Sequence, residues 1–126
     1  MKKLYVGHAT KDFDFEGLLY SPLQHSDIAL SHQLILPHAA GGGPFKSEAL
    51  FKNADGDLLM LADLSVPSIG LGMEIAWARQ YKIPVLFCAQ TGSSPSSAAE
   101  FVWGTRYRLI SYKNAEALTT GLALLL

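Results

Sequence analysis

The sequence predicts an α/β fold: a three-layer sandwich in which helices cover both faces of a five-stranded, mostly parallel sheet of the flavodoxin-like or Rossmann-like kind. Three observations predict this class. Short apolar runs alternate with longer, helix-like stretches along the chain. Residues 84–89 form a continuous apolar run, as expected of a parallel strand covered on both faces. The first apolar run stops at Gly7 and is followed by a polar loop, which is how a βα unit begins.

The expected strands and helices alternate from one end of the chain to the other. The apolar runs expected to be strands are residues 4–7, 32–37, 57–62, 84–89 and 107–112, the last being more polar and therefore near an edge. The expected helices are residues 15–30, 47–53, 70–82, 97–103 and 114–126. Pro22 interrupts the first helix, so we expect it to be broken or kinked. The loop 37–44 contains three consecutive glycines, which suits either a mobile active-site loop or a surface connection.

Composition narrows the class of protein. With 126 residues, of which 49% are hydrophobic, residues 1–126 are expected to form one domain with a sizeable core. A net charge of −1 and the absence of a Lys/Arg block argue against a nucleic-acid or membrane surface, so we expect a small-molecule partner. The single cysteine, Cys88, lies in an apolar run and indicates a reduced compartment. Because no apolar stretch is long enough for a signal peptide or a membrane span, we expect a cytoplasmic protein.

Residues 57–79 read as a strand, a glycine-bearing turn and a helix. Gly70 and Gly72 would let a ligand approach the backbone, and the start of the helix offers free N–H groups to an anion. Glu74 lies in the first turns of this helix, among residues so apolar that we expect the helix to be buried nearly all round. A carboxylate in such a place needs a partner or a function. The alternative is that Glu74 serves the helix dipole, paired with Arg79.

In a parallel α/β sheet, ligands bind outside the carboxyl ends of the strands. We therefore expect one cleft at these ends, lined by His8, His38, Asp63 and Glu74. Spacings typical of metal ligands, P-loops, dinucleotide-binding turns and nucleophile elbows are all missing, so we expect neither a metal ion nor a cofactor.

The segment DLSVPSIGLGMEIAWA, residues 63–78, resembles the nucleoside 2-deoxyribosyltransferase superfamily. Its closest branch is similar to the 2'-deoxynucleoside 5'-phosphate N-hydrolases, whose motif runs acid-Val-Thr-x-Pro-Ser-x-Gly-x-Gly-x-Glu. The resemblance implies that Glu74 is the nucleophile that attacks the anomeric carbon of the sugar. It implies that Ser68 binds a 5'-phosphate and that Ser96 or Ser97 reaches the phosphate site of a neighbouring subunit, hence a homo-oligomer.

The candidate site residues combine these two lines of reasoning. The candidate catalytic residues are Glu74 and Asp63. The candidate substrate-binding residues are Tyr5, Gly7, His8, His38, Ser65, Ser68, Gly70, Gly72, Ser96 and Ser97.

The chain also departs from the pattern of the hydrolases it resembles. They open with G-S-x-R-G-G after the first strand, whereas residues 7–11 here read GHATK. Their aspartate that assists the leaving base aligns near residues 49–50, where the nearest acid is Glu48, so protonation of the leaving base is unassigned. The leading hypothesis is cleavage or transfer of the N-glycosidic bond of a (deoxy)nucleoside or its 5'-monophosphate. The alternative is a nucleotide-binding module without turnover, since a purely structural domain would leave residues 68–74 unexplained.

Overall fold

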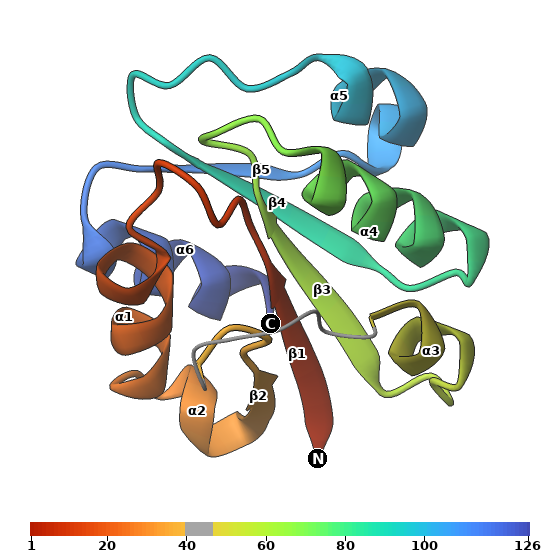
Figure 1. Cartoon of the computed structure of the whole chain (residues 1–126). Helices are drawn as coiled ribbons and strands as arrows, with labels where there is room; N and C mark the ends of the chain where they lie inside the picture. The colour runs from red at the N-terminus through yellow and green to blue at the C-terminus, as the bar shows by residue number, and fades with distance from the viewer. Residues whose placement is uncertain (40–46) are drawn as a thin grey trace.

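The computed structural model describes residues 1–39 and 47–126, and it contains a five-stranded sheet in which every strand pair is parallel (Figure 1). The strands are β1 (Lys2–Gly7), β2 (His32–Ile35), β3 (Leu58–Asp63), β4 (Val85–Gln90) and β5 (Leu109–Tyr112). Their order in the sheet is β2-β1-β3-β4-β5, the flavodoxin-like arrangement. The predicted fold class is therefore confirmed.

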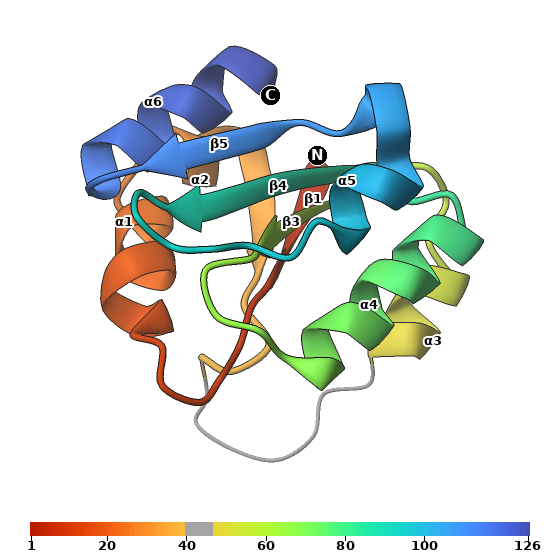
Figure 2. The same ribbon diagram turned by 90° about the horizontal axis from the view of Figure 1, so that it is seen from above.

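Helices cover both faces of this sheet, as Figure 2 shows from above. One face carries α3 (Ser47–Lys52), α4 (Ile69–Gln80) and α5 (Ala98–Trp103), followed by the short helix η2 (Gly104–Arg106). The other face carries η1 (Glu16–Tyr20), α1 (Ser21–Gln24), α2 (Ile28–Ser31) and α6 (Ala115–Leu125). In the part of the chain that the structure describes, no helix has the length and apolar character needed to cross a bilayer.

Alternation along the strands divides the core in two. On β1, Tyr5 faces the core under α3 and α4, whereas Leu4 and Val6 face the core under α1 and α6. On β3, Ala62 faces the first core and Leu61 the second. This alternation decides on which side of the sheet each residue at a strand end projects.

The expected helix over residues 15–30 is three short pieces. The π-helix η1 gives way to α1 directly before Pro22, so the first change in the helix falls at the proline, where a break or kink was expected. A second interruption comes after α1, where Ser26 competes with the helical hydrogen bonds. Its hydroxyl donates to the Leu23 carbonyl at 2.8 Å and accepts the N–H of Ile28 at 3.3 Å. The loop 37–44 falls mostly outside the described residues, which leaves its role a prediction.

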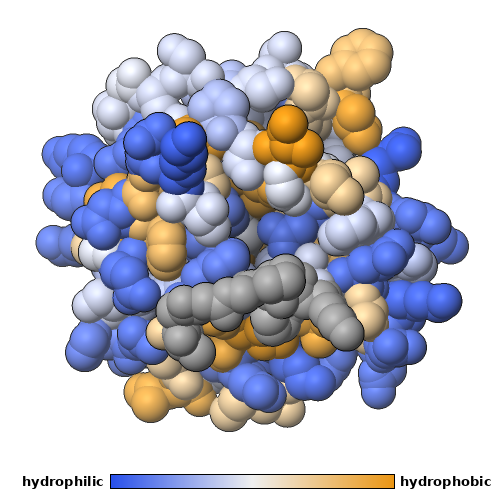
Figure 3. Space-filling view, viewed as in Figure 1, coloured by the Kyte–Doolittle hydropathy of each residue, from blue (hydrophilic) through white to orange (hydrophobic). Residues whose placement is uncertain are grey.

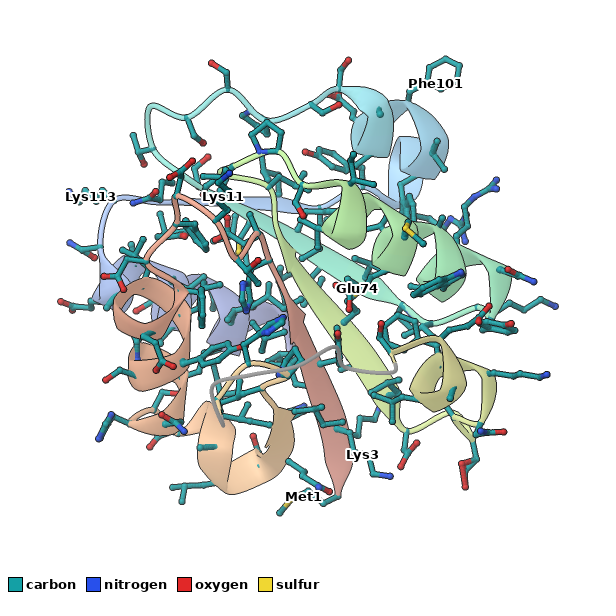
Figure 4. All side chains as sticks on the ribbon, in the orientation of Figure 1. Met1, Lys3, Lys11, Glu74, Phe101 and Lys113 are labelled. Atoms are coloured by element: carbon teal, nitrogen blue, oxygen red, sulfur yellow. The ribbon has the colours of Figure 1, made fainter. Side chains whose placement is uncertain are left out.

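The expectation that α4 is buried nearly all round is wrong. Only Leu71 and Ala78 are buried, whereas Ile69 is 87% exposed and Met73 is 49% exposed. The reason is that α4 belongs to an outer layer, and apolar residues on its outer side meet solvent. Phe101 of α5 is also 90% exposed and points away from the molecule in Figure 4. Figure 3 shows apolar side chains gathered over α5 at this end of the surface.

Candidate active site

Glu74 projects from α4 toward the sheet (Figure 4), where side chains from three elements meet. The hydroxyl of Tyr5, on β1, donates a hydrogen bond to Oε2 of Glu74. The Ser47 side chain, at the start of α3, hydrogen-bonds to both Tyr5 and Glu74. Among the described residues Glu74 forms no ion pair with Arg79, so the predicted alternative of a helix-dipole pair is not what the structure shows.

Gly7 lies two residues after Tyr5 on the same face of β1 and borders Glu74. A Cβ at this position would lie 2.7 Å from Cε of Met60, 3.1 Å from Cδ1 of Leu71 and 3.6 Å from Oε1 of Glu74. The missing side chain therefore brings the backbone of β1 close to Oε1, while Tyr5 holds Oε2.

The electrostatics of this pair reflect its burial. Burial raises the pKa of Glu74, and the hydrogen bonds from Tyr5 and Ser47 together with the positive charge of His38 only partly offset that rise. Burial and the negative charge of Glu74 raise the pKa of Tyr5, so the phenol keeps its proton and acts as the donor. The site thus holds a half-buried carboxylate with its hydrogen-bond donors in place. This carboxyl group ionises at a higher pH than an exposed glutamate does.

His8 follows Gly7 and is fully engaged in internal hydrogen bonds. Its Nε2 lies 2.7 Å from the Tyr20 hydroxyl, and its Nδ1 lies 2.8 Å from the carbonyl of Ala9. The Tyr20 oxygen already accepts the N–H of His38 at 3.1 Å, so its own proton points to Nε2. His8 is therefore the neutral, Nδ1-protonated tautomer, and burial lowers its pKa. Its ring stacks on Phe15 with the centroids 4.4 Å apart.

His38 lies beside His8, with ring centroids 5.5 Å apart, three residues after the end of β2. Its backbone is fixed by the Tyr20 hydroxyl, and its half-buried ring also packs near Phe15, at 6.0 Å. Its charge acts on both His8 and Glu74. His38 therefore lies near both His8 and Glu74. His8 itself is 5% exposed with both ring nitrogens engaged, which corrects the expectation that it lines a cleft and binds substrate.

Asp63 does not join them. Its carboxylate is 1% exposed and faces the core under α6, where it accepts hydrogen bonds from the Tyr112 hydroxyl, from the thiol of Cys88 at 3.5 Å and from the N–H of Ser65 at 2.8 Å. The Ser65 hydroxyl in turn accepts the N–H of Gln90 at 2.8 Å. The expected cleft is therefore corrected, because Asp63 projects to the opposite face of the sheet from Tyr5 and Glu74. Asp63 and Ser65 instead link the end of β3 to β4 and β5 through hydrogen bonds.

Ser68 begins α4, and its hydroxyl accepts the N–H of Leu71 at 3.2 Å. The two glycines that follow are exposed, and packing among the described residues does not require them. A Cβ at Gly72 would meet nothing within 4 Å, and one at Gly70 would meet only Oγ of Ser68, at 3.8 Å. This turn is therefore open to an approaching molecule.

Ser68 and Ser96 line one groove, between α4 and α5, with a volume of about 1200 Å³. Its floor is apolar, and three cationic residues line it: Arg79, Lys82 and Arg106. Ser97 is exposed next to this groove, at the start of α5. Glu74 does not line the groove, because it projects from α4 toward β1, whereas Ser68 borders the groove from the N-terminal end of α4.

Ser47 is the site residue that sequence reasoning missed. A single serine before a short helix carries no signal, and only the packing of α3 against α4 brings it to Glu74. Tyr20, which orders both histidines, was missed for the same reason. Within residues 1–39 and 47–126, His, Cys, Asp and Glu side chains do not gather in groups of three that could hold a metal ion.

No family model matches the chain. A protein of Syntrophotalea carbinolica named "Putative 2'-deoxynucleoside 5'-phosphate N-hydrolase 1" is 36% identical over an alignment of 92 residues, which covers 68% of this chain. The match spans 64% of that relative, somewhat less than two thirds of its length.

A solved structure, that of a CMP N-glycosidase of Clostridium botulinum, shares the fold. It has a TM-score of 0.69 and 18% sequence identity, and the match covers 99% of this chain and 100% of that one. The relative that is similar in sequence is named as an N-hydrolase, and the structural similarity to the N-glycosidase covers nearly the whole chain. Together with the motif at residues 63–78, these findings make the chain similar to the nucleoside 2-deoxyribosyltransferase-like superfamily in part of its sequence and in its fold.

Proposed function

We propose that this protein cleaves the N-glycosidic bond of a nucleoside 5'-monophosphate, with Glu74 as the nucleophile. The observation that carries the proposal is the half-buried Glu74 carboxylate beside Gly7, held by Tyr5 and Ser47. A buried carboxylate with a raised pKa and dedicated donors is typical of a site of chemistry. The names of the two similar proteins support nucleotides as the substrate class.

The chemistry follows that of a retaining glycosidase. Tyr5 holds Oε2, which leaves Oε1, next to Gly7, as the attacking atom. Oε1 bonds to the anomeric carbon as the bond to the base breaks, and the negative charge of Glu74 stabilises the oxocarbenium-like transition state. Water then hydrolyses the glycosyl ester and restores the carboxylate. Transfer to a second base in place of water gives the transferase variant of the same reaction.

Base release from a panel of ribo- and 2'-deoxyribonucleoside 5'-monophosphates, followed by chromatography, tests the proposal. We expect free base and a sugar phosphate, and in a rapid-quench experiment a glycosyl adduct on the peptide that contains Glu74. A second base added in excess distinguishes transfer from hydrolysis. Tight binding of a nucleotide with no base release over hours would instead favour the nucleotide-binding module.

The 5'-phosphate is assigned to Ser68 and the N–H groups at the start of α4. Ser68→Ala is expected to raise KM for a monophosphate by about 10- to 100-fold, the equivalent of one lost charge-assisted hydrogen bond. For the unphosphorylated nucleoside the variant should have the same KM as the wild type, because this substrate has no phosphate that Ser68 could bind. Steady-state kinetics with the two substrates measures the difference, and an equal loss on both would remove Ser68 from phosphate binding.

We also propose a homo-oligomer, at least a dimer, in which a second copy covers the groove between α4 and α5. The apolar floor of the groove and the exposed Ile69 and Phe101 at its end support this, as does the superfamily resemblance that gives Ser96 or Ser97 to a neighbour's phosphate site. Sedimentation at micromolar concentration should show a dimer or larger species, which Phe101→Asp should dissociate. Leu30→Asp, on the far face and 77% exposed, is the matched control that should not.

A further inference from the structure

The two histidines at the ends of β1 and β2 differ in what their rings are free to do. Both ring nitrogens of His8 are occupied, by Tyr20 and by the carbonyl of Ala9. The ring nitrogens of His38, in contrast, make no hydrogen bond to any residue that the structure describes. His38 is only half-buried, so part of this residue is open to a ligand.

The position of His38 is nevertheless well defined. Its N–H donates to the Tyr20 hydroxyl at 3.1 Å, and its ring packs against His8 at 5.5 Å and Phe15 at 6.0 Å. Its charge is close enough to Glu74 to lower the pKa of that carboxyl. An imidazole held near a nucleophile, with neither ring nitrogen bonded to a described residue, has the placement of a general acid–base group.

We propose that His38 is the acid–base residue that protonates the leaving base and then activates water, an assignment that rests on the proposed function. Other described groups near the site are engaged elsewhere. Asp63 projects to the opposite face of the sheet, the Tyr5 proton is held by Glu74, and Glu48 is exposed on α3. Titratable groups around His38 in the described structure are His8, Tyr20 and Glu74.

The two steps balance. As Oε1 of Glu74 bonds to the anomeric carbon, the electron pair of the glycosidic bond moves to the base, and the imidazolium of His38 gives that base its proton. The neutral imidazole next takes a proton from water while the water oxygen bonds to the anomeric carbon. The ester bond breaks, and Glu74 and protonated His38 are restored.

Leaving-group dependence tests this role. The substrates are a pair of monophosphates of one base class that the wild type cleaves: 2'-deoxyuridine and 5-fluoro-2'-deoxyuridine monophosphate, or for purines 2'-deoxyguanosine monophosphate and its N7-methyl derivative. The second member of each pair carries a base that leaves with little or no protonation. His38→Asn should lower kcat/KM by about 10²–10⁴-fold on the first member and by less than about 10-fold on the second. Added imidazole should restore part of the activity of His38→Ala on the first.

The controls separate the possible failures. His25→Asn removes an exposed histidine whose contacts lie within its own turn, and it should behave as the wild type. Thermal melts establish that the His38 variants fold, with His38→Gln as a second replacement. An equal loss on both substrates without imidazole rescue, or no loss, would overturn the role of His38 and leave the nucleophile standing. No base release by the wild type from any nucleotide would overturn the proposed function itself, and with it this assignment.

Discussion

Glu74→Gln should lower kcat for base release by at least about 10³-fold while nucleotide binding persists. Glutamine keeps the shape of the side chain and can still accept the Tyr5 hydrogen bond, but it lacks the charge that meets the developing oxocarbenium ion and cannot form the glycosyl ester. Single-turnover kinetics measures the chemical step, and calorimetry with a nucleoside monophosphate measures binding. Glu48→Gln, which neutralises an exposed acid on α3, is the matched control and should retain activity.

The same substitution should make the protein more stable at neutral pH. Folding raises the pKa of Glu74, so the folded state binds this proton more tightly than the unfolded state does. Stability therefore falls as pH rises from the unfolded pKa through the higher folded pKa, and the full cost is present above both. Glutamine carries no charge to bury, so we expect the free energy of unfolding to increase by roughly 0.5–2 kcal/mol, as is common when a residue kept for function is replaced. Melting temperatures of the two proteins should converge near pH 4 and below.

Two outcomes would contradict this account of Glu74. Retained turnover in Glu74→Gln, on each nucleotide that the wild type cleaves, would exclude a covalent intermediate on this residue. A variant that is less stable than the wild type at neutral pH would indicate that the carboxylate is kept for structure. The second outcome would revive the prediction that Glu74 serves the helix.

The sequence was sufficient to predict most of the fold, and physical reasons explain the rest. Short apolar runs that alternate with helices are typical of a parallel sheet covered by helices. The fifth run is more polar, which predicts an edge strand, and β5 lies at an edge of the sheet. The exposure of α4 could not be predicted. Apolar residues are distributed around the whole helix, and that pattern predicts burial even when the outer side of the helix meets solvent.

The site was predictable only where it is local in sequence. Ser68, Gly70, Gly72 and Glu74 share one turn and one helix, so a single motif carries them. Asp63 is just before that turn, yet it projects to the other face, and sequence alone did not reveal which face α4 covers. Ser47 reaches Glu74 only through the packing of two helices, which has no local signal.

Tyr5→Phe should lower kcat/KM at neutral pH by about 10- to 100-fold, since a hydrogen bond to a charged group contributes about 1.5–3 kcal/mol. Activity requires ionised Glu74, so it falls as pH decreases through the pKa of that carboxyl. The hydrogen bond from Tyr5 lowers the pKa of Glu74, whereas burial raises it. Without the hydroxyl the effect of burial is less compensated, so the pKa of Glu74 rises further. The acidic limb of the pH profile should therefore move to higher pH in the variant, and part of the activity should return as the solution becomes more alkaline.

The pH profile of kcat/KM measures this shift, with Tyr81→Phe as the matched control. Tyr81 is a partly buried tyrosine at the end of α4, and its hydroxyl makes no hydrogen bond within the described residues. A loss by the same factor at every pH would mean that Tyr5 only positions the carboxylate. An acidic limb that moves to lower pH would contradict the donor role, because a phenol that donates to Glu74 can only favour its ionised form.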